Sequence, residues 1–223
     1  MADRYDVMND VMSGGLHRLW KRHLVQNITL YNTMQILDLA GGPGDIAFRL
    51  YEKAQRQPVS VASTVADINK AMLDTGRARA LDKGILDGMR WQETDAEALP
   101  FTDGSFDVCT MTFGIRNVTD RQRALSDIFR VLTPGGLFAC MEFTQVDNLS
   151  LRKLYDAYSF KVIPALGEKI TQDREAYQYL VESIRQFPSR EAFAGMMEAA
   201  GFAHVGTEAL TQGVVTIFTG RKL

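Results

Sequence analysis

Gln35-Ile36-Leu37-Asp38-Leu39-Ala40-Gly41-Gly42-Pro43-Gly44 joins an apolar run to a cluster of glycines. The apolar part predicts a buried strand, and the glycines predict a tight turn that leads into a helix. Similar segments alternate after it: strands are expected at 59–66, 89–93, 106–112 and 137–143, and helices at 45–54, 69–83 and 120–132. Because this alternation is typical of βαβ units, we predict an α/β fold with helices on both faces of a parallel sheet.

Both ends of the chain depart from this alternation. Apolar residues at helical spacing, namely Leu16, Leu19, Trp20 and Leu24, predict a helix at 15–27. After Phe143 we expect helices at 149–170, 174–185 and 189–200, then antiparallel strands at 202–209 and 214–219. The prediction is one domain over 1–223 with a seven-stranded, mostly parallel sheet. Its parts are an N-terminal cover segment and helix (1–30), a cofactor-binding half (35–143), a helical insertion that forms a lid (149–188), and a closing helix and strands (189–223).

Composition excludes several classes of protein. A net charge of −2 over 223 residues gives no basic footprint for nucleic acid, and no apolar run reaches the roughly 18 residues that span a bilayer. Cys109 and Cys140 lie in apolar runs, so we expect buried free thiols in a reducing compartment, with a disulfide between them as the alternative. His17, His23 and His204 lack metal-ligand spacing, so no metal site is expected; His17 and His23 are predicted at the surface of their helix.

Three elements at the ends of the predicted strands suit a nucleoside-bearing cofactor. The turn at Gly41, Gly42 and Gly44 lets backbone approach a ligand closely, because no Cβ intervenes. Asp67 ends the second strand, where a carboxylate can accept both ribose hydroxyls, and Asp95 after the third strand can accept from the adenine amine. Taken singly, a glycine turn can serve only helix packing, and an acidic loop can be merely solvated. The loop is neither G-x-G-x-x-G nor followed by G-K-[ST], which disfavours dinucleotides and nucleoside triphosphates.

These residues also carry a resemblance to a known family. The matching stretches are Tyr5–Asp10 (YDVMND), His17–Lys21 (HRLWK), Leu37–Asp45, Asp67–Asn69, Phe113–Val118 (FGIRNV) and Leu132–Gly136. With them the chain resembles the UbiE-type quinol C-methyltransferases of ubiquinone and menaquinone biosynthesis. The resemblance implies a Rossmann-like class I fold, S-adenosylmethionine as the cofactor, and cofactor contacts at Gly41, Gly42, Pro43, Gly44, Asp67, Ile68, Asp95, Ala96 and Thr112. Pro43 stands where the family usually has threonine, which removes a hydroxyl and an N–H from the loop.

C-methylation of a quinol requires a nucleophilic ring carbon, which forms when a neighbouring hydroxyl loses its proton. We expect Arg116 to stabilise the phenolate and orient a water, and Asn117 to hydrogen-bond the cofactor or that water. The resemblance places Tyr5 over the pocket, where it closes the site or contacts the quinol; packing alone is the alternative. For Arg116 the alternative is a structural ion pair with Asp120 or Asp107. The role of Glu142, at the end of the fifth strand, stays open.

The resemblance also implies a polyprenyl quinol as substrate, either a benzoquinol or a demethylmenaquinol. Apolar residues of the insertion would form a groove for its tail or simply pack as a helical core: Tyr155, Tyr158, Phe160, Val162, Ile163 and Leu166. Arg18, Lys21 and Arg22 would contact anionic lipid or form a solvated face. A homodimer, a quinone-biosynthesis complex, another small-molecule acceptor and a non-catalytic partner role stay open. The implied location is the bacterial cytoplasm, with or without peripheral membrane contact, or the mitochondrial matrix.

Overall fold

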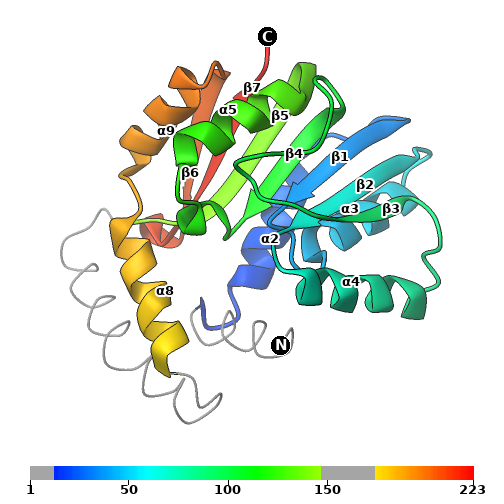
Figure 1. Ribbon diagram of the computed structural model, residues 1–223, viewed down its shortest axis with the longest axis horizontal. Helices are drawn as coiled ribbons and strands as arrows, with labels where there is room; N and C mark the ends of the chain where they lie inside the picture. Colours follow the sequence, from blue (N-terminus) through cyan, green and yellow to red (C-terminus); the bar gives the residue numbers. More distant parts are fainter. Residues whose placement is uncertain (1–12, 147–173) are drawn as a thin grey trace.

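The computed structural model describes residues 13–146 and 174–223, and its centre is a seven-stranded sheet (Figure 1). The strand order is β3-β2-β1-β4-β5-β7-β6, and β7 alone runs antiparallel to its neighbours β5 and β6. The strands are β1 (Met34–Leu39), β2 (Val61–Asp67), β3 (Met89–Glu93), β4 (Phe106–Thr112), β5 (Leu132–Phe143), β6 (Ala203–Leu210) and β7 (Val215–Arg221). The predicted mostly parallel sheet, closed by an antiparallel pair, is therefore confirmed.

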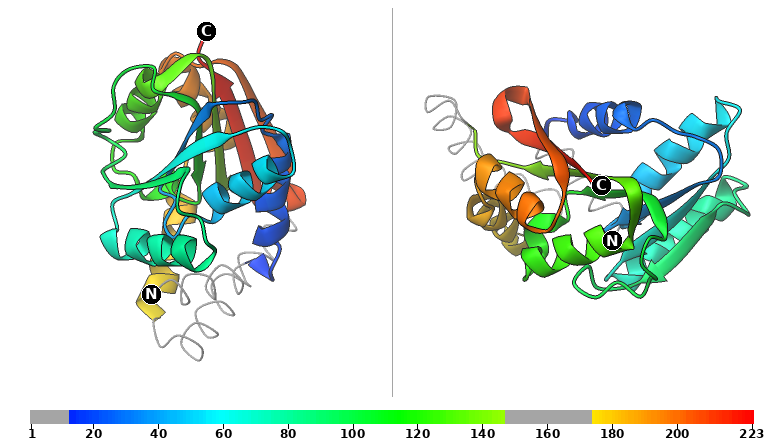
Figure 2. Two further views of the ribbon diagram at one scale, coloured as in Figure 1. Left: turned by 90° about the vertical axis from the view of Figure 1, so that its right-hand side faces the viewer. Right: turned by 90° about the horizontal axis from the view of Figure 1, so that it is seen from above.

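Helices cover both faces of this sheet, as Figure 2 shows when the molecule is seen from above. α2 (His17–Asn27) and α3 (Asp45–Gln55) lie on one face, and α5 (Arg121–Val131) and α9 (Arg190–Ala199) lie on the other. The remaining described helices are α4 (Lys70–Asp82), α8 (Arg174–Gln186) and the short 3-10 turns η1 (Ile115–Asn117) and η3 (Thr211–Gly213). The predicted helix at 149–170 lies outside the described residues.

Each face of the sheet has its own apolar core. One core joins Leu24 of α2 and Leu50 of α3 to Ile36 of β1, and each of these side chains is at most 1% exposed. The other joins Leu125 of α5 and Phe193 of α9 to neighbouring positions of the same strands. Because successive strand residues point to opposite faces, a strand that is covered on both sides becomes a nearly continuous apolar run, as residues 36–40 are apart from Asp38.

The fifth strand begins earlier than predicted. It starts at Leu132 and contains Pro134-Gly135-Gly136, which lie between the predicted helix at 120–132 and the predicted strand at 137–143. The pairing with β4 shifts register between Phe106 and Val108 to accommodate the extra residues. The backbone of Gly135 and Gly136 exchanges hydrogen bonds with Lys222, just beyond β7. The turn therefore becomes an irregular start of the strand, held by the C-terminal end of the chain.

Helix α2 forms where it is predicted, but polar residues lie on the face that it buries. Lys21 is one of them, so its expected place on a lipid-contacting or solvated face is wrong. Leu16 and Leu19 are 38% and 55% exposed, whereas His17 and Lys21 are buried. His17 hydrogen-bonds the Ser13 hydroxyl at 3.0 Å, so its predicted surface position is wrong, while His23 lies near the surface within 2.7 Å of Glu208. The polar partners of the buried residues, more than the apolar spacing, determine which face of α2 is buried. A buried charge needs a partner, whereas an exposed leucine costs little free energy.

Three further findings concern the cysteines, membrane-spanning helices and metal sites. Cys109 and Cys140 are free, so the alternative of a disulfide is wrong, and burial raises the pKa of both thiols. No helix in the described ranges is long and apolar enough to cross a bilayer. Within those same ranges, no group of His, Cys, Asp or Glu side chains is placed to hold a metal ion.

Candidate functional site

A cavity of about 380 Å³ opens at the carboxyl ends of β1, β2 and β4. Here β1 is flanked by β2 on one side and by β4 on the other, and this reversal of strand order is the usual ligand site of open α/β sheets. Ten predicted site residues line it: Gly41, Gly42, Pro43, Asp67, Ile68, Asp95, Ala96, Thr112, Arg116 and Asn117. Gly44 is not in the wall, and Tyr5 lies outside the described residues.

The loop after β1 is fixed by close packing of its own backbone. A Cβ on Gly41 would lie 2.8 Å from the carbonyl oxygen of Asp38 and 2.8 Å from Val65 Cγ1, which leaves no room for a side chain. Gly44, at the N-cap of α3, has a φ of +81° and packs against Trp91. Gly41 thus brings backbone to the cavity, whereas Gly44 serves the packing of helix on strand.

A buried carboxyl group supports this loop from below. Asp38 is 1% exposed, and its two oxygens accept hydrogen bonds from the Thr110 hydroxyl at 2.8 Å and the Ala47 N–H at 3.1 Å. Burial raises the pKa of Asp38 to about 7, although these hydrogen bonds and the nearby Lys21 act in the opposite direction. Asp38 therefore ties the end of β1 to β4 and to the first turn of α3.

Asp67 lies where the sequence predicts a ribose-binding carboxylate. Its Oδ2 accepts from the Gly42 N–H at 2.9 Å, and its Oδ1 accepts from the Asn69 N–H at 2.8 Å. Each oxygen keeps a further lone pair for a ligand hydroxyl. Beside it the Ile68 side chain is 69% exposed, which is an unusual position for isoleucine on a protein without a ligand.

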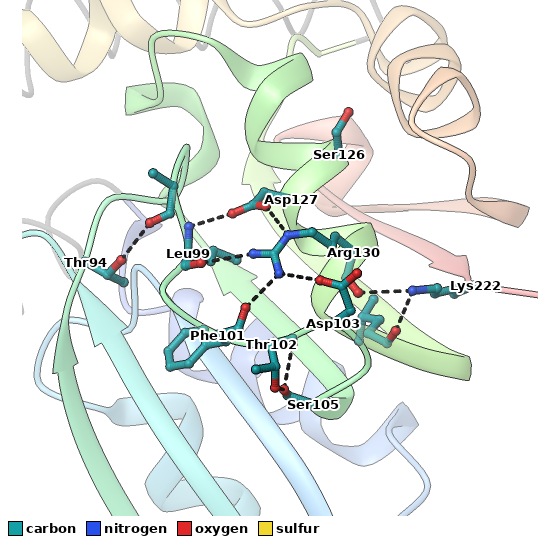
Figure 3. Close-up of polar contacts among 12 residues, drawn as sticks. Thr94, Leu99, Phe101, Thr102, Asp103, Ser105, Ser126, Asp127, Arg130 and Lys222 are labelled. Atoms are coloured by element: carbon teal, nitrogen blue, oxygen red, sulfur yellow. Dashed lines mark hydrogen bonds and ion pairs between the residues drawn. The ribbon is translucent and has the colours of Figure 1, made fainter.

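The loop after β3, which carries Asp95 and Ala96, is clamped by Arg130 of α5 (Figure 3). The guanidinium donates to Asp127 at 2.6 Å, to Asp103 at 2.8 Å, and to the carbonyls of Leu99 and Phe101 at 3.0 and 2.7 Å. Asp127 also accepts from the Leu99 N–H at 2.6 Å. Our sequence reasoning missed Arg130, and no spacing signals it, because most of its acceptors lie 27 to 31 residues away.

The same loop is tied to the start of α5 by a second contact. The Glu97 carboxylate accepts from the Asp120 N–H at 2.9 Å, and the Asp95 carboxylate accepts from the Glu97 N–H at 2.9 Å. The Asp95 carboxylate is thus oriented by a backbone turn that α5 holds at two points.

Arg116 makes a buried ion pair with Glu142 of β5. Its Nη1 lies 2.8 Å from Glu142 Oε1, and the two side chains are 5% and 0% exposed. The same carboxylate accepts from the backbone N–H of Arg116 at 3.3 Å and of Phe143 at 2.8 Å. The expected alternative partners are therefore wrong: Asp120 caps α5, and Asp107 accepts from the backbone of Gln35.

Two buried polar atoms in the cavity wall lack a hydrogen-bond partner among the described residues. They are the Nε of Arg116, a donor, and the hydroxyl of Thr112. Buried polar atoms are nearly always satisfied, so these two indicate where a bound molecule would contact the wall.

Helix α8 also reaches the site. The Tyr179 hydroxyl donates to Asn117 Oδ1 at 3.3 Å, so the helix before β6 contacts the loop after β4. Two other tyrosines near this region, Tyr158 and Tyr177, are weaker candidates from the sequence, but Tyr158 and the side chain of Tyr177 lie outside the described residues. Nothing in the local sequence distinguishes Tyr179 from these neighbours.

The donor set fits a nucleoside-bearing cofactor. Asp67 and Asp95 provide carboxylates, the glycine loop provides close backbone, and Thr112 provides an unsatisfied hydroxyl. Residues 1–222 match the model of the ubiE/COQ5 methyltransferase family. The chain belongs to this family. The predicted resemblance is thereby confirmed, and the ubiE/COQ5 family together with the fold implies S-adenosylmethionine as the cofactor.

Individual members of the ubiE/COQ5 family match the whole chain. It is 52% identical to the ubiquinone/menaquinone biosynthesis C-methyltransferase UbiE of Methylobacterium nodulans and covers 88% of that protein. It is 50% identical to the mitochondrial 2-methoxy-6-polyprenyl-1,4-benzoquinol methylase of Arabidopsis thaliana, and 46% identical to that of Xenopus laevis, and it covers 82% of each.

Solved structures support the fold of the ubiE/COQ5 chain. An S-adenosylmethionine-dependent methyltransferase of Thermotoga maritima has a TM-score of 0.66 at 19% identity, with 100% of this chain and 96% of that one covered. A putative methyltransferase of Bacillus halodurans has a TM-score of 0.64 at 16% identity, with 91% and 98% covered. The fold is therefore the Rossmann-like class I methyltransferase fold that the resemblance implied.

Proposed function

We propose that the chain transfers a methyl group from S-adenosylmethionine to a ring carbon of a polyprenylated benzoquinol, of a demethylmenaquinol, or of both. The observation that carries this proposal is the buried Arg116, which lines the cavity beside the cofactor loops and whose Nε–H has no partner among the described residues. The names of the relatives point to the same substrates, in bacteria and in mitochondria.

S-adenosylmethionine supplies an electrophilic methyl group when it is bound. The protein's task is then to place the quinol in line with that methyl group and to raise the electron density of the ring carbon. A ring carbon beside a deprotonated hydroxyl forms the new C–C bond with its electron pair as the S–C bond breaks. The same carbon afterwards loses its proton, which restores the aromatic ring.

Arg116 favours the deprotonated hydroxyl in this scheme. Arginine does not act as a base, since its pKa exceeds about 12, so the proton passes to a water that Arg116 and Asn117 orient. Glu142 neutralises one edge of the guanidinium and fixes its position, which leaves Nε for the oxyanion. A preorganised donor of this kind stabilises charge as it develops, because it does not have to reorient during the reaction.

The cofactor is held in the proposal by the residues that the sequence predicts. Asp67 accepts the ribose hydroxyls, Asp95 accepts the adenine amine, and Ile68 and Ala96 flank the ring. The backbone of Gly41, Gly42 and Pro43 supports the amino-acid end. Thr112 contacts the cofactor through its hydroxyl, Gly44 holds α3 in place behind the loop, and Tyr5 closes the site.

We propose a peripheral site of action for the whole enzyme, because a polyprenyl quinol resides in a membrane. Some relatives are named as mitochondrial and others are bacterial proteins, which supports a location in the mitochondrial matrix or in the bacterial cytoplasm. A homodimer and a complex with other quinone-biosynthesis enzymes are compatible with this role.

The test is a methyl-transfer assay with labelled S-adenosylmethionine and short-tailed demethyl-benzoquinol or demethyl-naphthoquinol kept reduced. We expect label on the ring carbon. Arg116→Lys keeps the charge opposite Glu142 but loses the planar set of donors, so kcat should fall about 100-fold while the affinity for S-adenosylhomocysteine stays within about threefold. Arg123→Lys, an exposed position of α5, is the control and should leave both quantities unchanged.

Three results would contradict parts of this proposal. Label on oxygen, or transfer to neither quinol by a protein that binds S-adenosylhomocysteine, would indicate a different acceptor. No binding of S-adenosylhomocysteine would indicate a non-catalytic role. Full activity of the Arg116→Lys variant would remove Arg116 from the catalytic group.

A further inference from the structure

Lys21 is a buried cation in the cavity wall. Its side chain is 5% exposed, and its Nζ lies 2.9 Å from Asp45 Oδ2. In the described part of the chain, Lys21 and Arg116 are the two cations that line the cavity. Among the described residues, Glu142 forms an ion pair with Arg116 and with no other cation. Asp45, in contrast, is shared between Lys21 and a second cation. The contact between Lys21 and Asp45 therefore differs from an ordinary structural ion pair, in which each charge has one partner.

Asp45 does not need Lys21 for neutralisation. Its other oxygen accepts from Arg49 Nε at 3.0 Å, one turn further along α3, so two cations meet one carboxylate. An ammonium has three N–H donors, and among the described residues only Asp45 accepts from Lys21. Burying a lysine that is only partly satisfied is costly, and that cost indicates a missing anion.

The position of Lys21 fits a particular part of the methyl donor. Asp67 and Asp95, the contacts proposed for ribose and adenine, follow β2 and β3, which lie on one side of β1. Helix α2 reaches the cavity from the other side, because Trp20 packs edge-on against Phe143 of β5 with ring centroids 6.2 Å apart. The nucleoside and Lys21 are thus placed at different ends of the cavity.

Acidic groups accompany Lys21 at its end of the cavity. Asp38 and Asp45 both line the wall, and the charge of Lys21 acts on the pKa of Asp38. Pro43 lies in the same wall and has no N–H to offer a carboxylate. A buried ammonium next to carboxyl groups is complementary to an amino-acid zwitterion, which brings one charge of each sign.

We propose that the Lys21 ammonium binds the α-carboxylate at the amino-acid end of the methyl donor. This assignment rests on the proposed function, and it makes Lys21 a determinant of affinity for ligands that carry that carboxylate. Lys21 supplies a charged donor for that carboxylate, whereas Pro43 in the same wall has no N–H to donate.

Calorimetric titration of the full chain with two ligands tests the assignment. S-adenosylhomocysteine carries the amino-acid end, and 5′-methylthioadenosine shares the nucleoside but lacks it. Lys21→Met should raise the Kd for S-adenosylhomocysteine about 10- to 100-fold, as expected for the loss of a charged hydrogen bond, and should change the Kd for 5′-methylthioadenosine less than about twofold.

Arg49→Met is the matched control. It removes the other cation from the same Asp45, but Arg49 is not in the cavity wall, so both Kd values should stay within about twofold of wild type. Lys21→Arg keeps the charge and should retain most of the affinity for S-adenosylhomocysteine. If Lys21→Met does not fold, Lys21→Gln keeps a polar head and serves for the same comparison.

The outcomes separate this inference from the proposed function. Equal weakening of both ligands by Lys21→Met would show that Lys21 only shapes the cavity, and unchanged binding of S-adenosylhomocysteine would also overturn the assignment. Failure of the wild-type protein to bind either ligand would overturn the proposed cofactor, and the assignment with it.

Discussion

The loops after β1 and after β3 both face the cavity, but they are held in opposite ways. The first, at residues 40–44, is fixed from within, because Gly41 packs directly on the backbone of Asp38 and leaves no space for a side chain. The second, at residues 94–105, is fixed from outside by the guanidinium of Arg130, which reaches over from α5 (Figure 3). The first loop depends on steric fit between residues a few positions apart. The second depends on hydrogen bonds between residues about thirty positions apart in the sequence.

This difference predicts how each loop fails. A close-packed interior cannot absorb even one extra methyl group without moving backbone, so the first loop should respond sharply to small changes. A clamp that is partly exposed to solvent can lose some of its hydrogen bonds and still keep an approximate geometry, since water replaces part of what is lost. The second loop should therefore weaken gradually.

The largest effect is expected from Gly41→Ala. The new Cβ would meet three atoms at 2.8 to 2.9 Å, including the carbonyl and carboxyl oxygens of Asp38, so the backbone of the loop must shift from its position in the cavity wall. We expect the Kd for S-adenosylhomocysteine, measured by calorimetry, to rise about 100-fold, which lies toward the upper end of overpacking costs of roughly 1–3 kcal/mol.

Gly195→Ala provides the control for this change. Gly195 lies in α9 with nothing within 4 Å of an added Cβ, so alanine there should leave binding unchanged and stabilise the helix slightly. Near-normal binding by Gly41→Ala would mean that the glycine loop does not position the ligand and would remove the basis of the comparison.

A smaller effect is expected from Arg130→Met. The variant removes the guanidinium bonds to Asp127, Asp103 and two loop carbonyls, which frees the segment that carries Asp95 and Ala96. We expect the Kd for S-adenosylhomocysteine to rise about 10-fold, as for the loss of one or two net hydrogen bonds, while kcat at saturating cofactor stays near wild type.

The control for the clamp is Arg123→Met, an exposed arginine of the same helix, which should change neither quantity. A fall in kcat without a change in the cofactor Kd or KM would show that the clamp acts on the chemistry instead of on cofactor binding.

The smallest effect is expected from Asp38→Asn, which tests the buried carboxyl group beneath the first loop. The pKa of Asp38 is about 7 in the folded protein, above its ordinary value of 3.8. The folded state therefore holds the proton more tightly, and the stability that this gives is complete below about pH 4 and lost as the pH rises through 7. The asparagine amide can satisfy both Thr110 and Ala47 without ionising.

Thermal melts of the ligand-free protein check this prediction. The melting temperature of Asp38→Asn should exceed that of wild type by about 5 °C at pH 8, and the difference should shrink toward pH 5. A difference that is constant across this range would show that Asp38 does not ionise within it.

Sequence patterns predict how the first of these two loops is built, but not what holds the second. The glycine loop, Asp67 and Asp95 are visible as residue types at fixed distances from predicted strands, and all three lie in the cavity wall. Arg130, Glu142 and Lys21 are not visible in that way, because their partners come from other elements. The exposed Leu16 and Leu19 show the same limit: apolar spacing identifies a helix, but does not determine which of its faces is buried.

By itself, the sequence determined the α/β class, the order and type of the described elements, the glycine turn after β1 and the carboxylates after β2 and β3. These follow from apolar periodicity and from backbone sterics, which act over a few residues. Only the tertiary structure decided that Arg116 faces Glu142, that Arg130 holds the loop after β3 and that Lys21 is buried beside Asp45. The reason is that a buried charge takes its partner from whichever element packs against it, and packing is a property of the whole fold.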